Sequence, residues 1–277
     1  MRKSSHTEKE IDLHHLLKTF ACLLLLLPVH VLADFDHGEW DRLLREHVRV
    51  QGGGIATQVD YSGMAADRAV LKAYLAEVAM VPRSTFDSWS TSAQLAFLIN
   101  VYNACTVDVI LEEYPDIDSI RDIGFLFSSA WNQKFASLFG EPVTLDEIEH
   151  DMIRGWGRYQ EPRIHFAVNC AAIGCPALRA EAYVSDRLEM QLEDSTKLFL
   201  SDRSRNYYDN GRMYISSIFD WYEEDFEQSW GGIDSVAEFL ARYAAELEVD
   251  VGTAKQLRTG DIRIRHLRYD WSLNDTR

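Results

Sequence analysis

Histidines and cysteines able to do acid–base or nucleophilic chemistry lie close together in the second half of the sequence. Cys170 and Cys175 enclose a loop of small residues, and His165 and His150 precede them. A thiol becomes a nucleophile only where a neighbouring base or positive field produces the thiolate. The segment Arg163–Pro176 is therefore the expected functional centre.

Backbone geometry bears on which histidine serves Cys170. The β-branched and aromatic content of Arg163–Val168 predicts a strand. In a strand His165 and Cys170 point to opposite faces and lie ~16 Å apart, at about 3.3 Å per residue. His165 then pairs with Cys170 only if the chain folds back at Asn169. His150, which arrives from another element, is the less constrained base.

A thiol–imidazole pair also needs a third group that orients the imidazole. Asn100 or Asn103 is expected in that role, with Glu149 or Asp146 as alternatives. Together with Thr106, the two asparagines form a polar stripe on a predicted helix. Because buried amides need hydrogen-bond partners, the stripe equally favours a brace between the helix and a loop.

Other polar residues complete the predicted site. Asn169, Arg163 and Glu149 are expected to contact a bound substrate. No metal or cofactor is expected, because the spacing His165-x-x-x-x-Cys170-x-x-x-x-Cys175 matches no standard zinc finger. The His-x-Glu and Pro-Cys-x-x-Cys signature of zinc deaminases is absent as well. The alternative to any chemistry is that His165 and the cysteines are core residues.

The composition indicates a folded protein with few polyanionic partners. Hydrophobic residues form 47% and aromatic residues 12% of the 277 positions, enough for a well-filled core. The formal net charge of −16 repels nucleic acid and anionic lipid, so the expected partner is a peptide or small molecule.

The first residues predict a secretory signal peptide over residues 1–33. Basic residues precede the apolar stretch Phe20–Leu27, and Val31-Leu32-Ala33 places small residues before a cleavage site. The apolar stretch is too short to span a bilayer, so no stable membrane insertion is expected after cleavage. The protein is thus expected to be exported, periplasmic or secreted. Cleavage leaves Cys105, Cys170 and Cys175, of which the last two are the obvious candidates for a bridge.

The pattern of apolar residues predicts an α+β fold in which helices outnumber strands, as a single domain over residues 34–277. Ser92–Glu113 is apolar on nearly every side, which indicates a buried central helix. Thr144 and Glu147 form a capping box at the start of another helix. The predicted helices are Asp36–Val50, Ala65–Ala79, Ser92–Glu113, Leu145–Arg154, Asp186–Ser201, Ser217–Phe226 and Ile233–Glu246. Extended segments are expected over Ile55–Tyr61, Arg163–Val168, Asp261–Tyr269 and a hairpin, Asn206–Ile215, that turns at Asn210-Gly211.

A set of motifs, spread from about Tyr61 to Asn274, resembles the domain of unknown function 547 family. They are Leu95–Asn103, Ile120–Gly124, Leu145–His150, Pro162–Cys170, Gly174–Pro176 and Tyr269–Asn274. The family has no established activity and includes exported bacterial proteins. Its relationship in fold to papain-like and transglutaminase-like thiol enzymes implies a central helix packed on a small, mostly antiparallel sheet.

The sequence departs from papain-like enzymes in one respect. In those enzymes the nucleophilic cysteine opens the central helix, whereas the comparable stretch here offers Asn100 and Asn103. Cys105 lies well inside the helix, where it resembles a core residue. The resemblance therefore implies either a nucleophile that has moved to the Cys170 loop or a domain that has lost catalysis and binds a ligand.

The leading functional expectation is a thiol-dependent hydrolase or acyl transferase that acts on a peptide-like or amide substrate. Cys170 is the expected nucleophile, with Cys175 as second choice, and His150 or His165 is the base. The alternative is a non-catalytic binding module for a thiol compound or peptide, and a third possibility is a purely structural domain. An imidazole within hydrogen-bond reach of a sulfur supports catalysis, whereas a stable Cys170–Cys175 bridge favours the binding module.

Overall fold

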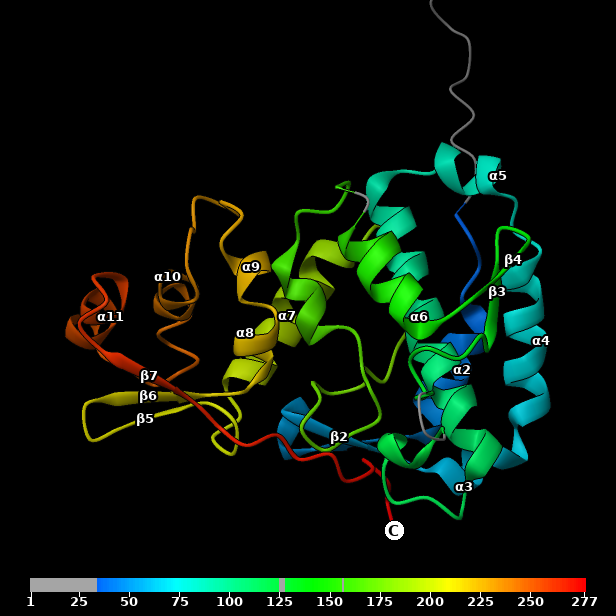
Figure 1. Cartoon of the computed structure of the whole chain (residues 1–277), viewed down its shortest axis with the longest axis horizontal. Helices are drawn as coiled ribbons and strands as arrows, with labels where there is room; N and C mark the ends of the chain where they lie inside the picture. The colour runs from blue at the N-terminus through cyan, green and yellow to red at the C-terminus, as the bar shows by residue number, and fades with distance from the viewer. Residues whose placement is uncertain (1–33, 125–127, 156) are drawn as a thin grey trace, which may run out of the picture. The chain divides into compact units, whose positions relative to one another are not determined.

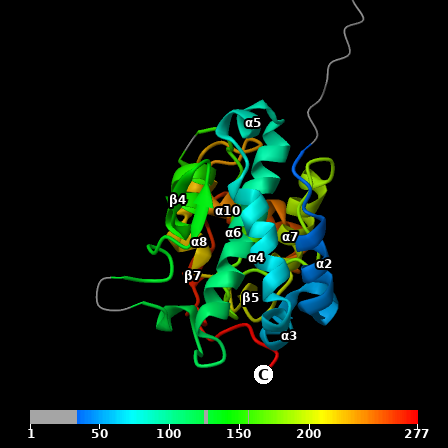
Figure 2. The same ribbon diagram turned by 90° about the vertical axis from the view of Figure 1, so that its right-hand side faces the viewer.

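Helix α6 (Thr91–Glu113) lies inside the protein, with other elements on all sides (Figures 1 and 2). Every residue from Ala93 to Leu111 is buried, and the Ser90 hydroxyl caps the first turn by accepting from the Ala93 N–H at 3.1 Å. Within the described residues, α6 is the one helix long and apolar enough to cross a membrane, and its apolar stretch is wholly buried. The expected central helix is confirmed.

The computed structural model describes residues 34–124, 128–155 and 157–277. The predicted signal peptide, residues 1–33, lies outside the described residues. Asp34–Arg277 forms one compact unit. Its α-helices besides α6 are α2 (Gly38–His47), α3 (Tyr61–Ala66), α4 (Arg68–Ala79), α5 (Arg83–Ser88), α7 (Leu188–Leu200), α8 (Ile218–Trp221), α9 (Glu223–Phe226), α10 (Val236–Arg242) and α11 (Val251–Arg258). The 3-10 helices are η1 (Gly52–Gly54), η2 (Ile120–Asp122) and η4 (Pro162–Phe166), and η3 (Glu147–Arg154) is a π-helix.

The strands form three small sheets, most of whose pairs are antiparallel. They are β1 (Val48–Gln51) with β2 (Ala56–Val59), β3 (Ala136–Leu138) with β4 (Glu141–Val143), and β5 (Tyr207–Asp209) with β6 (Arg212–Ile215) and β7 (Arg263–His266). Only β6 and β7 run parallel among these pairs. Asn210 and Gly211 have φ of +47° and +77°, as the tight turn of the predicted hairpin requires.

The α+β class and the small sheets match the sequence prediction, but the expected sheet beneath the central helix does not. Helix α6 packs mainly against α3, α4 and η3. Figure 1 shows β5–β7 beside α10 and α11, on the side of the protein away from α4. The helix is buried because helices surround it, and apolar side chains on all its faces are what such a position requires.

The prediction of a strand over Arg163–Val168 is wrong, because this segment opens with the 3-10 helix η4. Pro162 occupies the first helical turn, where its missing N–H costs nothing. The Glu161 carboxylate accepts from the Arg163 N–H at 3.1 Å and caps the helix. These local signals outweigh the β-branched side chains that favour a strand. A 3-10 helix rises only about 2 Å per residue, so the ~16 Å separation expected between His165 and Cys170 does not apply.

A closing segment, Tyr269–Thr276, ties distant parts of the chain together. Figure 1 shows it running from β7 past β2. The Val59 N–H donates to the Asn274 carbonyl at 2.8 Å, and the Thr276 N–H donates to the Val59 carbonyl at 3.2 Å. The segment also hydrogen-bonds the backbone of Ala171, Ile173 and Gly174, which belong to the loop Cys170–Cys175, called the cysteine loop below.

Candidate functional site

A cavity of about 230 Å³ lies where α6, η3, the cysteine loop, α8 and the closing segment meet. Part of its lining is an aromatic set, which we call the aromatic wall: Tyr102, Trp131, Trp221, Tyr222, Tyr269 and Trp271. The polar lining includes Asp146, Glu149, His150 and His165, and Cys170 adds a sulfur. The structure thus brings both predicted histidines and one predicted cysteine to a single cavity.

Four rings of the aromatic wall are in contact with one another. Trp221 stacks on Trp271 with ring centroids 5.7 Å apart, and Tyr269 lies 4.6 Å from Trp271 and 4.8 Å from Trp221. Trp131 meets Trp271 edge-on at 5.8 Å. Trp221 is 46% exposed, so part of the wall faces solvent. Exposed ring faces of this kind bind apolar groups and cations.

His165 is held by an acidic partner that the sequence analysis missed. Its Nε2 lies 2.6 Å from the Oδ2 of Asp225, which also receives the Arg154 guanidinium at 2.6 Å. Burial raises the pKa of Asp225, but the hydrogen bonds from His165 and Arg154 outweigh it and lower that pKa to about 2. Burial lowers the pKa of His165 more than its hydrogen bond to Asp225 raises it. The imidazole is therefore neutral at pH 7.

The tautomer of His165 follows from this pairing. Because Asp225 is ionised and can only accept, the imidazole proton lies on Nε2 and leaves Nδ1 as an acceptor. The Nδ1 atom is buried and has no hydrogen-bond partner among the described residues. The imidazole stacks on Tyr222 with ring centroids 3.9 Å apart. The arrangement resembles the base and orienting acid of a catalytic triad, without a nucleophile bonded to the base.

The π-helix η3 positions the acidic side of the cavity. The predicted capping box is confirmed at its start: the Thr144 N–H donates to Glu147 at 2.7 Å, and the Glu147 N–H donates to the Thr144 hydroxyl at 3.0 Å. Asp146, Glu149 and His150 follow on one face and line the cavity. Wide π turns are frequent at functional sites.

Glu149 is a buried carboxylate with neutral partners. It is 4% exposed and accepts the Tyr222 hydroxyl at 2.7 Å. Burial, followed by the charge of Glu149 and a hydrogen bond to it, raises the pKa of the Tyr102 hydroxyl. No lysine, arginine or histidine of the described residues forms an ion pair with Glu149, and Arg154 is paired with Asp225 instead. Glu149 therefore forms no ion pair among the described residues, and the nearby charge of Arg154 acts on it only from a longer distance.

Cys170 and Cys175 form a disulfide, as the sequence suggested, and Cys105 is a free thiol. Burial raises the pKa of Cys105 to about 12, which makes it an unreactive core residue. The Tyr269 hydroxyl lies 3.1 Å from each bridged sulfur, and the Cys170 N–H donates to the Cys175 sulfur at 2.9 Å. No imidazole of the described chain hydrogen-bonds either sulfur, so the bridged form offers no activated thiolate.

The predicted orienting asparagines are braces rather than members of the cavity. Asn100 donates to the Tyr183 carbonyl at 2.7 Å and accepts from the Tyr183 N–H at 3.0 Å. Asn103 donates to the Ala167 carbonyl at 3.0 Å and accepts from the Asn169 N–H at 2.8 Å. Each amide thus satisfies both backbone groups of a passing loop. Of the two interpretations left open by the sequence, the structure favours the brace.

Of the three residues predicted to bind substrate, one lines the cavity and two do not. Asn169 is buried, donates to the Pro176 carbonyl at 2.7 Å and accepts from the Ala171 N–H at 2.9 Å, so it shapes the cysteine loop from within. Arg163 is buried away from the cavity and is ion-paired with Glu161, Glu189 and Glu193. Only Glu149 of the three lines the cavity. Asn169 and Arg163 have structural roles.

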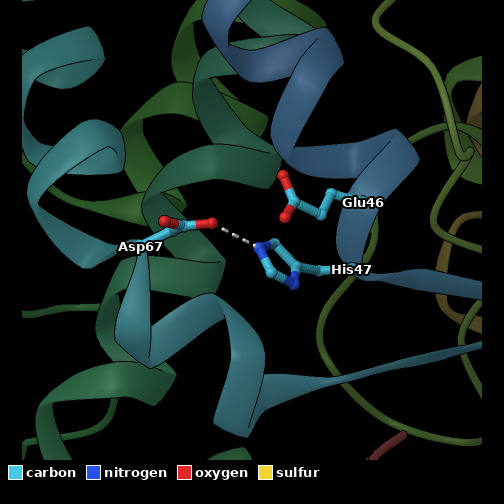
Figure 3. A group of neighbouring side chains, drawn as sticks. All are labelled: Glu46, His47 and Asp67. Carbon is cyan, nitrogen blue, oxygen red and sulfur yellow. Dashed lines mark hydrogen bonds and ion pairs between the residues drawn. The ribbon is translucent and has the colours of Figure 1, made fainter.

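A second group of polar side chains lies apart from the cavity, where α2 meets the start of α4 (Figure 3). The potential ligand atoms of Glu46, His47 and Asp67 all lie within 4.8 Å of one another. His47 Nε2 is 2.9 Å from Asp67 Oδ2, and the exposed Glu46 pairs with Arg42 at 2.8 Å. These contacts satisfy the group without an ion, so we do not assign it as a metal site.

Comparison with known proteins gives one match. Residues 86–200 match the model of a family described as a protein of unknown function, DUF547. No curated protein and no solved structure matches the chain. The matched segment runs from α5 to α7 and contains η3, η4 and the cysteine loop, whereas Asp225 and most of the aromatic wall lie beyond it. The match over residues 86–200 is to the same family that the motifs of the chain resemble.

Proposed function

We propose that this protein is a binding module whose cavity takes a positively charged group, an ammonium or guanidinium, carried by a small molecule or peptide. The observation that carries the proposal is Glu149, a buried carboxylate in the cavity wall that forms no ion pair among the described residues. Buried charges in proteins are normally paired. A cationic ligand supplies the missing partner.

The surroundings of Glu149 support a cation and oppose an anion. The described lining contains the carboxylates of Asp146 and Glu149 but no lysine or arginine. Two rings of the aromatic wall already lie beside cationic side chains. The Arg154 guanidinium lies 5.0 Å from the Tyr222 centroid, and that of Arg121 lies 5.3 Å from the Trp271 centroid. Aromatic faces beside a carboxylate are the chemistry that recognises ammonium groups.

The size of the cavity limits the bound group. A volume of about 230 Å³ is smaller than the 300–1,000 Å³ of drug-sized sites, so it accommodates one side chain or a small amine. The exposed part of Trp221 extends the apolar surface outward. The rest of a peptide would lie over this ring.

Calorimetric titration with phenethylamine tests the proposal, with phenethyl alcohol as the neutral analogue and 3-phenylpropionate as the anionic one. We expect the amine to bind, the alcohol to bind at least tenfold more weakly, and the carboxylate not to bind. Glu149→Gln should remove the preference for the amine, whereas Glu77→Gln, at an exposed site on α4, should preserve it. Equal affinities for amine and alcohol in the unmodified protein would refute the proposal.

A thiol-dependent hydrolase or acyl transferase on a peptide-like or amide substrate is the second candidate. It is favoured by the neutral imidazole of His165, which is paired with ionised Asp225 and lines the same cavity as Cys170. This candidate function is the one that a relationship in fold to papain-like and transglutaminase-like enzymes would imply. It requires that the Cys170–Cys175 bridge be reduced. After reduction, iodoacetamide should alkylate Cys170 with a depressed thiol pKa, and His165→Ala should abolish that depression. Alkylation at the rate of an ordinary thiol would remove this candidate.

We also propose that the protein is exported, as residues 1–33 predict. An oxidising compartment is where a bridge such as Cys170–Cys175 persists. Fractionation of expressing cells should find the chain outside the cytoplasm and starting near Asp34. A full-length cytoplasmic chain would contradict this proposal.

A further inference from the structure

We propose that Cys170–Cys175 is an exchangeable disulfide, through which the cavity captures thiol compounds covalently. The incoming thiolate attacks the sulfur of Cys170, and Cys175 is the leaving group. This activity goes beyond the proposed binding of cations, because a neutral thiol is sufficient for it. It is carried by the different exposure of the two sulfurs and by the hydrogen bonds around them.

Access selects the sulfur that is attacked. Cys170 is partly exposed and lines the cavity, whereas Cys175 is 3% exposed and does not line it. Thiol–disulfide exchange depends on which sulfur the attacking thiolate reaches. A small thiol that enters the cavity therefore meets the sulfur of Cys170 first.

The groups around Cys175 favour its departure as a thiolate. Its sulfur accepts the Cys170 N–H at 2.9 Å, and the Tyr269 hydroxyl, which lies 3.1 Å from the sulfurs of both cysteines, donates to the Cys175 sulfur as the bond breaks. Burial raises the pKa of Tyr269, so its hydroxyl remains a donor at neutral pH. Two fixed donors stabilise a developing negative charge, and a stabilised thiolate leaves faster.

The loop is shaped to keep Tyr269 in this position. A Cβ atom on Gly174 would lie 2.9 Å from the Tyr269 ring and 2.9 Å from the Asp270 carbonyl oxygen, too close for any side chain. The Gly174 N–H donates to that carbonyl at 2.8 Å. Glycine at this position lets the closing segment approach the bridge closely.

The exchange balances without an external oxidant. The incoming thiol loses its proton to water, and its sulfur forms a bond with Cys170 as the Cys170–Cys175 bond breaks. The electron pair of the broken bond stays on Cys175, which becomes the thiolate that Tyr269 and the backbone stabilise. Attack of this thiolate on Cys170 reverses the step and releases the thiol.

The experiment uses the oxidised full chain with 2-mercaptoethanol, followed by acid quenching, iodoacetamide and peptide mapping. We expect the mercaptoethanol adduct on Cys170 and the alkyl group on Cys175. An adduct mainly on Cys175, or an equal distribution, overturns the proposal. This readout needs no variant, so a variant that fails to fold does not affect it.

Variants then test the leaving group. Tyr269→Phe should slow formation of the adduct roughly tenfold, because it removes one hydrogen bond to the leaving thiolate. Tyr208→Phe, on the hairpin strand β5, should leave the rate unchanged. Equal rates for folded Tyr269→Phe and the unmodified protein overturn the role of Tyr269. Phenethylamine titration and the exchange with mercaptoethanol are measured separately on the unmodified protein, so failure of cation binding and failure of exchange are separate outcomes.

Discussion

The imidazole of His165 donates to the carboxylate of Asp225 across 2.6 Å, and this hydrogen bond joins the 3-10 helix η4 to helix α9. Arg154 of η3 reaches the same carboxylate at 2.6 Å. Three elements that are separate in the sequence thus meet at one acidic group. The protonation of this group is therefore coupled to the stability of the cavity.

Acid should destabilise the protein partly through Asp225. The pKa of Asp225 is about 2 in the folded protein, against 3.8 ordinarily, so its stabilisation is complete above about pH 4 and is lost as pH falls toward 2. The difference corresponds to about 2 kcal/mol. Urea denaturation at each pH should show that the free energy of unfolding falls less over this pH range for Asp225→Asn than for the unmodified protein. Asp220→Asn, at an exposed position on α8, should keep the full loss, and an identical loss in all three proteins would contradict the prediction.

His165 should be neutral, with its proton on Nε2, in the folded protein at pH 7. Because burial lowers its folded pKa, the unfolded chain binds the proton more readily, so stability declines as pH falls below about 6.5. Nitrogen-15 NMR of the imidazole should show the Nε2–H tautomer at pH 7. A protonated ring, or a proton on Nδ1, would be incompatible with the pairing to Asp225.

Asn100→Ala should lower stability without changing ligand binding. The substitution leaves the buried N–H and carbonyl of Tyr183 without partners, at a cost of about 2–4 kcal/mol. Thr106→Ala is the matched control, since the Thr106 hydroxyl bonds only the Tyr102 carbonyl of its own helix, and it should cost less than about 1 kcal/mol. Thermal unfolding and phenethylamine titration measure the two effects. A large change in affinity with unchanged stability would restore Asn100 to the site.

Removing the closing segment should open the cavity. A chain that ends at Arg268 lacks Tyr269 and Trp271 of the aromatic wall and the backbone bonds to the cysteine loop. We expect a lower melting temperature, no binding of phenethylamine and faster reduction of the disulfide. Removal of Arg277 alone deletes its ion pair with Asp275 and its hydrogen bonds to the carbonyls of Pro115 and Ile117, so it should lower the melting temperature but leave phenethylamine binding and disulfide reduction unchanged. Unchanged reduction kinetics in the longer truncation would mean that the segment does not protect the bridge.

The features that sequence reasoning predicted depend on local patterns. The burial of α6 follows from apolar side chains on nearly every side, and the start of η3 follows from the pairing of Thr144 with Glu147. The turn at Asn210-Gly211 follows from residues that tolerate positive φ. In each case the residues that decide the structure lie within a few positions of one another.

The features that it missed depend on contacts between distant segments. Asp225 lies in the acidic run Glu223–Asp225, and nothing in its neighbours distinguishes it from a solvated side chain. The aromatic wall is assembled from α6, α8, the closing segment and the loop before β3. These segments are far apart in the sequence, so no regular spacing of aromatic residues predicts the wall. The wrong prediction over η4 had a different cause. The strand was predicted from the β-branched residues, whereas Pro162 and the capping Glu161 determine the structure of this segment.

The closing segment has a consequence for the order in which the protein is made. Synthesis delivers the chain from its N-terminus, so α6, η3 and both cysteines of the loop emerge before Tyr269. Until that residue arrives, the Cys170–Cys175 pair has no hydroxyl beside it and no aromatic cover. The two cysteines are therefore made before the segment that covers them, and closure of the cavity has to wait for the last residues of the chain.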